Sequence, residues 1–413
     1  MTLFFLGCII ILEGNFLKIG AIKNIIIGVL ACLLVAVICL YPVITTPQKL
    51  SNTIPTLNNT LTGQQPQTFP ANATRSDMAE AYLGAIATVN VEKTKTGAPV
   101  GFGSGVAVAD GGYLVTNFHV IYYVITNPET YSLNLTMQID GVLTEDIGAE
   151  LLWYNANLDI AVLKSAQNFD CYAPMADRWI NPTQGQKLRI AEEIWTLGTP
   201  FKKEYFGSYS EGTVSSADMR LCTTNVGGTY FTHSNLIQHT APISSGNSGG
   251  PLFDNSGKLI GLNTCGCTDS NTAEANSLFF AVPIYPITIV LDKIIAADQD
   301  AEADAWQTPK LNIFAYDRYS VELSSAGIAF NQNGTYIYSI ANTTKAYEAG
   351  LRAGYIITGI GNENCMDSSD VSYKEINFVH DLAYKLMQYN SGDKIKVFYQ
   401  AGLETNNAII QLD

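Results

Sequence analysis

The run Gly246-Asn247-Ser248-Gly249-Gly250-Pro251 sets one serine among glycines, within a string of turn-forming residues. Two islands upstream fit it, and each lies beside an apolar run typical of a strand. Residues 115–120 read Val-Thr-Asn-Phe-His-Val and contain His119, and residues 157–163 read Asn-Leu-Asp-Ile-Ala-Val-Leu and contain Asp159. A base, a carboxylate and a nucleophile thus follow one another in the order His, Asp, Ser, which is one of the chain orders in which catalytic triads occur.

The three residue types suit one another chemically. A serine hydroxyl is a weak nucleophile at neutral pH and needs an adjacent base to take its proton. Histidine has an ordinary pKa near neutral pH, and a buried carboxylate can fix its tautomer and stabilise its protonated form. The sequence therefore predicts Ser248 as the nucleophile, His119 as the base and Asp159 as the carboxylate that orients the base.

The glycines around Ser248 predict a second part of the same site. A negative oxygen develops on the attacked carbonyl, and backbone N–H groups must point at it. A tight turn can aim the N–H groups of Gly246 and Ser248 into one small space, and Gly249 and Gly250 let substrate backbone approach closely. Taken alone, each island also fits a plain turn, a core histidine or the start of a strand. Their joint occurrence in order favours the catalytic interpretation.

On these motifs the chain resembles the HtrA (Deg) family of trypsin-like serine proteases. The resemblance covers about residues 78–295 and is carried by residues 101–106, 112–117, 157–164, 194–200, 211–215, 237–253 and 279–283. The chain departs from the common family pattern at His239-Thr240, at Ser244-Ser245 and at Phe118. These departures concern fine specificity and activation-loop contacts rather than the triad.

The resemblance implies a mainly β fold, with a chymotrypsin-like double β-barrel. The residues agree, because the many short β-rich runs between positions 83 and 290 are broken by Gly, Asn and Asp, as in barrels and sandwiches. By the resemblance, the floor of the S1 pocket lies at Pro242, with Phe279 and Phe280 on its wall. No carboxylate lies between positions 241 and 247, so we expect cleavage after small or medium apolar residues. The resemblance also implies a homo-oligomer, typically a trimer.

Composition argues against some classes of function. The net charge of −14 argues against a nucleic-acid partner. No cysteine spacing matches a metal site, and no cofactor is expected. A disulfide is permitted in an oxidising compartment, with Cys222 to Cys265 or Cys267 as the favoured pairing and buried free thiols as the alternative. The connectivity stays open among Cys171, Cys222, Cys265, Cys267 and Cys365.

The N-terminal region predicts a membrane anchor. Residues 25–41 are uncharged and nearly all apolar, and residues 43–46 can extend the run, toward the ~20 residues that span a bilayer core. Lys18 and Lys23 precede the run and no charge follows until Lys49, which predicts a cytoplasmic N-terminus. No small-residue cleavage site follows, so an uncleaved anchor is favoured over a signal peptide. We therefore expect a single-pass cell-membrane protein whose larger part is extracytoplasmic.

Composition along the chain divides it into five expected segments. They are a cytoplasmic stub with a transmembrane anchor (1–45), a flexible linker (46–76), a trypsin-like protease domain (77–300), a second linker (301–314) and a C-terminal domain (315–413). The first linker is rich in Thr, Asn, Pro and Gln and has too little aliphatic content to form a core.

The last segment resembles a small α/β PDZ domain of the HtrA type. Its most specific part is Ala-Gly-Leu-x-x-Gly-x-Ile-Ile at 349–357, followed by one buried helix face near 376–389 and a strand candidate at 394–399. Such domains add a peptide as an extra strand at a sheet edge. By the resemblance, the loop Ser325-Ala326-Gly327-Ile328 receives a peptide C-terminal carboxylate. A domain used only for packing is the alternative.

Three functions compete on this sequence. The first is a membrane-anchored serine endopeptidase that degrades unfolded or misfolded extracytoplasmic proteins. The second is a regulatory protease that cuts one dedicated signalling substrate. The third is an inert protease scaffold that carries a PDZ binding module. The intact set of His119, Asp159 and Ser248 argues against the third.

Overall fold

The computed structural model describes residues 63–413 apart from 177, 180–185, 217–221, 227–228, 234, 267–277, 301, 321–322 and 324. The expected membrane anchor and most of the expected first linker lie outside these residues. Within the part of the chain that is described, no helix is long and apolar enough to cross a membrane.

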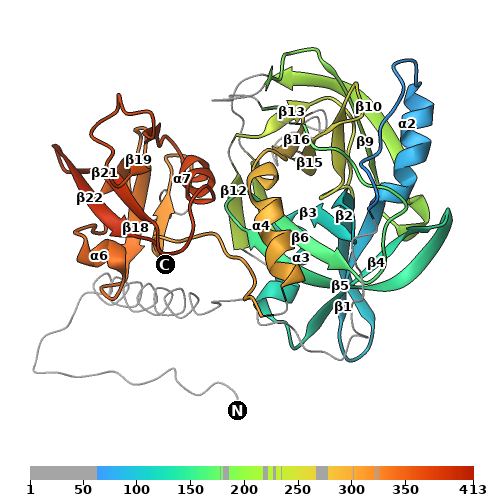
Figure 1. Ribbon diagram of the computed structural model, residues 1–413, viewed down its shortest axis with the longest axis horizontal. Helices are drawn as coiled ribbons and strands as arrows, with labels where there is room; N and C mark the ends of the chain where they lie inside the picture. The colour runs from blue at the N-terminus through green and yellow to red at the C-terminus, as the bar shows by residue number, and fades with distance from the viewer. Residues whose placement is uncertain are drawn as a thin grey trace, which may run out of the picture. The chain divides into compact units, whose positions relative to one another are not determined.

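The first six long strands close into an antiparallel barrel in the order β1-β2-β3-β6-β5-β4. Their bounds are β1 Ile86–Lys93, β2 Ala98–Ala109, β3 Tyr113–Thr116, β4 Tyr131–Ile139, β5 Val142–Asn155 and β6 Ile160–Ser165. Helix α3 (Phe118–Thr126) connects β3 to β4. The island that carries His119 is therefore a strand end followed directly by a helix start, whereas Asp159 lies in the turn before β6 (Figure 1).

The second barrel closes in the order β10-β13-β16-β15-β14-β9. Its strands are β9 Glu193–Gly198, β10 Ser208–Ser216, β13 Ile237–His239, β14 Pro251–Asp254, β15 Leu259–Gly266 and β16 Phe279–Pro283. The remaining short elements in this part are β7 Arg178–Trp179, β8 Gln186–Lys187, the 3-10 turn η3 Lys203–Tyr205 and the hairpin of β11 Cys222–Val226 with β12 Thr229–His233. Two closed six-stranded barrels confirm the expected mainly β fold.

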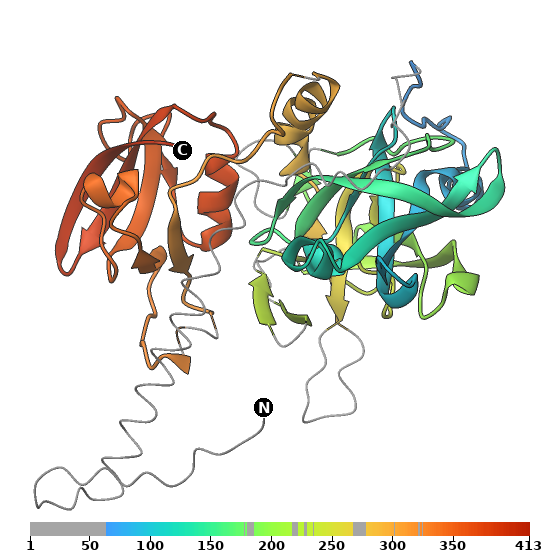
Figure 2. The ribbon, with the colours of Figure 1, turned by 90° about the horizontal axis from the view of Figure 1, so that it is seen from below.

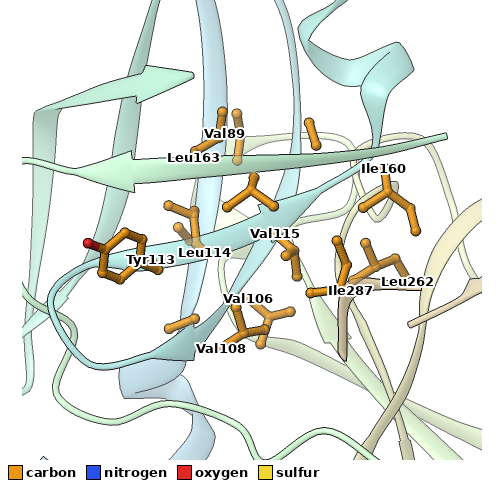
Figure 3. Packing of buried hydrophobic residues seen from close by; sticks show 14 of the residues in the cluster. Val89, Val106, Val108, Tyr113, Leu114, Val115, Ile160, Leu163, Leu262 and Ile287 are labelled. Carbon is orange, nitrogen blue, oxygen red and sulfur yellow. The ribbon is translucent and has the colours of Figure 1, made fainter. Parts of the chain in front are cut away.

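The barrel strands have a large apolar core because their inward side chains are mostly branched or aromatic. Val89, Val106, Val115 and Leu163 are fully buried. Figure 3 shows these side chains gathered between the strands, with Leu262 of β15 and Ile287 of helix α4 (Ile287–Gln299) in the same cluster. Removing such area from water is the main source of stability in a fold of this kind.

The chain ahead of the first barrel is partly ordered. Helix α2 (Arg75–Tyr82) begins at the N-cap Thr74, whose side chain and that of Asp77 form a capping box, and the 3-10 turn η2 (Leu83–Ala85) follows it. The Gln67 N–H donates to the Tyr172 carbonyl over 2.9 Å, and the Tyr82 ring stacks on Phe253 with centroids 4.6 Å apart. Residues 63–76, which were expected to be part of a linker, thus include a packed segment and a helix start.

The C-terminal part forms a sheet in the order β17-β18-β19-β21-β22, with β20 paired to β19 (orange to red in Figure 2). Its elements are β17 Ile313–Tyr316, β18 Thr335–Ile340, α6 Lys345–Glu348, β19 Ile356–Asn362, β20 Lys374–Glu375, α7 Val379–Leu386, β21 Lys394–Ala401 and β22 Glu404–Gln411. The sheet has its own core, in which Leu382 and Leu386 of α7 join Ile395 and Val397. Val379, which the spacing places on the helix face expected to be buried near 376–389, is only half-buried.

Candidate active site

His119 and Asp159 meet at the start of helix α3. The His119 Nδ1 lies 3.0 Å from Asp159 Oδ1 and 2.9 Å from Oδ2. The backbone N–H of His119 donates to the same Oδ1 over 3.0 Å. An N–H in the first helical turn has no partner within its own helix, so Asp159 caps α3 while it holds the imidazole. The carboxylate is fully buried and the His119 side chain is 14% exposed, which leaves the ring accessible to a substrate.

The Asp159 carboxyl stays ionised over most of the pH range although it is buried. Burial by itself raises the pKa of this group, but the charges of His119 and His233 and the hydrogen bonds from His119 lower the pKa to about 2. Asp159 adopts a left-handed backbone conformation with φ of 52°, and its own carbonyl accepts from Asn117 Nδ2 over 2.8 Å. The carboxylate is thereby held as an anion behind the imidazole.

Ser248 and Asp159 are joined through Thr264. The Thr264 hydroxyl donates to Asp159 Oδ2 over 2.7 Å, and the Ser248 Oγ donates to the Thr264 carbonyl over 2.9 Å. Among the hydrogen bonds of the described residues, none joins Ser248 to His119. A rotation about the Cα–Cβ bond of Ser248 would turn its hydroxyl from Thr264 toward another acceptor. The sequence offered no signal for Thr264, because its role depends on where strand β15 places it.

The turn around Ser248 is tightly packed and needs its glycines. Gly246 has φ of 99°, and a Cβ there would lie 2.6 Å from the Phe102 ring and close to the Thr199 carbonyl. The Ser104 hydroxyl donates to the Gly246 carbonyl over 2.7 Å, which fixes the turn against β2. Over the described part of the chain, no acceptor is found for the N–H of Gly246 or of Ser248. Both groups expected to meet a negative oxygen are therefore available.

The expected S1 residues lie at different depths. Phe279 and Phe280 are on β16 and pair with His239 and Gln238 of β13. Phe280 is buried and Phe279 half-buried, whereas Pro242 is exposed. The Phe279 ring stacks on His239, with centroids 6.2 Å apart. Burial lowers the pKa of His239 to about 4, so this histidine adds no charge beside the apolar rings at neutral pH.

The C-terminal loop expected to receive a peptide is open. Ser325, Ala326 and Gly327 are exposed and Ile328 is half-buried. Gly327 has φ of 71°, a left-handed conformation that favours glycine, and the Ile328 N–H donates to the Leu323 carbonyl over 2.9 Å. These residues form an exposed turn at the surface of the C-terminal part.

Two further expectations concern metal ions and cysteines. In the described residues, no cluster of His, Cys, Asp and Glu could hold a metal ion. Cys171 and Cys365 are buried free thiols that form no disulfide. The side chains of Cys222, Cys265 and Cys267 lie outside what the structure describes, so their expected pairing stays a prediction.

Two closed antiparallel barrels, with a histidine and an aspartate from the first and a serine from the second, define a trypsin-like serine peptidase. The family described as the trypsin-like peptidase domain matches residues 103–262. The serine protease Do-like HtrA of Lactococcus lactis subsp. lactis is 27% identical over 321 residues, which are 75% of this chain and 70% of that protein. The probable periplasmic serine endoprotease DegP-like of Brucella suis is 28% identical over 303 residues, 72% of this chain and 52% of that protein.

Solved structures agree on the fold. The HtrA-type protease AlgW with a tripeptide is 22% identical to this chain, with a TM-score of 0.52 over 82% of this chain and 97% of that one. The chain is therefore similar to trypsin-like serine proteases of the HtrA family. It spans about half the length of the Brucella relative, 52%, and a larger share of the Lactococcus relative, 70%.

Proposed function

We propose that the protein hydrolyses peptide bonds through an acyl-enzyme formed on Ser248. His119 takes the proton of the Ser248 hydroxyl as the oxygen attacks the scissile carbonyl, and then gives that proton to the leaving amine. Asp159 holds Nδ1 of His119 and stabilises the imidazolium while it exists. Water then attacks the acyl group, with His119 again as base, and releases the second product with free Ser248.

The N–H groups of Gly246 and Ser248 meet the negative oxygen in both steps. Such preorganised donors lower the barrier because they need no reorientation as charge develops. The single observation that carries the proposal is the pair of contacts from His119 Nδ1 to the buried Asp159 carboxylate, at 3.0 and 2.9 Å. Ser248 is linked to this pair by Thr264, which hydrogen-bonds to both Ser248 and Asp159.

The test is casein cleavage by the purified protein, with Ser248→Ala as the comparison. The proposal expects wild-type protein to produce many fragments and Ser248→Ala to produce none. Casein is unfolded, so many fragments also favour protein quality control. A single cut, or none in casein with activity on one folded substrate, favours the dedicated regulatory protease. Equal cleavage by Ser248→Ala contradicts the proposal.

For specificity, we propose small or medium apolar residues before the cut. The apolar rings of Phe279 and Phe280 support this, as does the absence of a carboxylate from positions 241–247. An apolar pocket separates substrates by only about 1–3 kcal/mol per methylene, so a spread of sites is expected. By the resemblance, Pro242 lies at the pocket floor, and the residue is exposed to solvent. Mapped cuts that fall mainly after Arg or Lys would overturn it.

For cellular context, we propose a single-pass anchor in residues 1–45 and an extracytoplasmic protease over 77–300 that acts on misfolded proteins. The apolar run at 25–41 supports the anchor, and the name of the Brucella relative, a probable periplasmic endoprotease, supports the compartment. Residues 315–413 are proposed as a PDZ domain that binds peptide C-termini at Ser325 to Ile328, and the assembly as a trimer. The fold neighbour AlgW has been solved with a tripeptide.

A further inference from the structure

A second histidine lies behind the candidate carboxylate. His233 ends strand β12 and is 2% exposed. Its Nε2 lies 3.9 Å from Asp159 Oδ2 and 2.9 Å from the Thr224 Oγ1 on the neighbouring strand. Its Nδ1 is buried, and no partner for it is found among the described residues. The hairpin of β11 and β12 thus places an imidazole against the same oxygen that accepts from Thr264.

The charge around His233 makes this contact sensitive to protonation. Its titratable neighbours are Asp159, from the turn before β6, and His119 on α3, together with His380 of α7, which lines the same small cavity. Burial lowers the pKa of His233, the charge of Asp159 acts in the opposite direction and that of His119 lowers it further. Near neutral pH the ring of His233 is therefore uncharged, and His119 is the histidine that pairs with the Asp159 carboxylate.

We propose that His233 is a positioning residue for the reaction, which acts through Asp159 and becomes a competitor of His119 when it is protonated. The inference rests on the proposed triad. A proton on His233 turns the 3.9 Å contact into an ion pair with the carboxylate. It also places a second positive charge near the imidazolium that forms on His119 during acylation, and like charges repel. Both effects destabilise the transition state.

On the acid side, the pH profile of kcat/KM should therefore depend on the protonation of two histidines. Activity requires His119 to be unprotonated as a base, and the proposal adds that His233 must be unprotonated as well. For each group that must be unprotonated, activity falls about tenfold for each pH unit below the pKa of that group. Wild-type kcat/KM should then fall with a limiting slope near two on a logarithmic scale, and a variant without His233 with a slope near one.

The experiment is a pH profile of kcat/KM for a short peptide substrate. His233→Gln is expected to lower the limiting slope from about two to about one. Within the steep region, the ratio of its kcat/KM to that of wild type should therefore grow about tenfold for each unit by which the pH falls. His380→Gln is the matched control, because His380 is also buried and lies 3.4 Å from a carboxylate, Asp381, but has no described contact with Asp159. Equal slopes for wild type and His233→Gln, or a changed slope in His380→Gln alone, overturn the inference.

A direct titration keeps the inference testable if His233→Gln fails to fold. The chain has 4 histidines, so their ring signals can be assigned one by one in an NMR spectrum. Asp159→Asn removes the charge that favours protonation of His233, so its titration should move to lower pH. An unmoved His233 signal contradicts the inference. Loss of turnover in Ser248→Ala together with an unmoved His233 would leave the proposed function standing and remove only this inference.

Discussion

Thr264 donates its hydroxyl to Asp159 Oδ2 over 2.7 Å, while its carbonyl accepts the Ser248 hydroxyl over 2.9 Å. One residue of strand β15 is therefore bonded to both ends of the candidate triad. The carboxylate of Asp159 has donors on two sides, from His119 and from Thr264, and it is fully buried. Its orientation follows from these bonds, and the orientation of His119 follows from Asp159.

We predict that Thr264→Val weakens both the fold and the reaction. The substitution keeps the shape but removes the donor to a buried carboxylate, which should lower the free energy of unfolding by about 1–3 kcal/mol. A less firmly held Asp159 should reduce kcat/KM by roughly tenfold, well below the ~10² that a misplacement of about 1 Å can cost. Urea unfolding and steady-state kinetics measure the two effects. Thr264→Ser keeps the hydroxyl and should restore most of both; equal losses in the two variants would argue against the hydrogen bond.

We predict that Asp159 contributes stability that is lost in acid. Its pKa in the folded protein is lowered from 3.8 to about 2. The contribution is therefore complete above about pH 4 and disappears as the pH falls toward 2, with a size on the order of 2 kcal/mol. In urea unfolding, the stability difference between wild type and Asp159→Asn should shrink by that amount over this window. Glu193→Gln, which removes an exposed ion pair with Arg75, should leave the acid slope nearly unchanged. Parallel curves for wild type and Asp159→Asn would refute the prediction.

We predict that Gly246→Ala disrupts the oxyanion site. The new Cβ would lie 2.6 Å from the Phe102 ring, at a backbone φ of 99° that an alanine rarely adopts. The turn must shift, so at least one of its N–H groups loses its aim, which costs about 10²–10³ in kcat. Gly101→Ala is the matched control, because a Cβ at Gly101 meets nothing within 4 Å. Equal kcat values for the two variants would show that the turn tolerates the change.

We predict that the exposed loop at Gly327 takes part in binding peptide C-termini. Gly327→Asp should weaken binding, because its carboxylate would repel that of the peptide. Peptide binding should change cleavage of a reporter by roughly 5–150-fold in wild type, the usual range of such coupling. Fluorescence titration and the reporter rate measure the two quantities. If apolar-ended peptides neither bind wild type nor alter its rate, the domain has a packing role.

The candidate triad was the easiest part of the site to derive from the sequence. His119, Asp159 and Ser248 each stand in a short motif, and their order along the chain has a chemical meaning. The two barrels were also predictable, because strands with apolar inner faces alternate with turn residues. These features are local, so the sequence displays them.

The partners of the triad could not be predicted in the same way. Thr264 and His233 reach Asp159 over sequence separations of 105 and 74 residues, so only the closed barrels and the β11–β12 hairpin bring them together. No motif marks either residue. Pro242 was placed in the S1 pocket by resemblance alone, and this placement stays a prediction; the residue is exposed. Helix α2 begins inside the expected linker, because Thr74 and Asp77 form a capping box that starts it there.

Reaction with a fluorophosphonate probe tests the central claim most directly, because such a probe phosphonylates a serine only when that serine is activated as a nucleophile. Mass spectrometry of the digested protein should find one adduct, on the peptide that contains Ser248. The adduct should be absent in Ser248→Ala and form far more slowly in His119→Ala, where the base is missing. An adduct on a different serine, or an unlabelled wild type that still cleaves casein, would contradict the account.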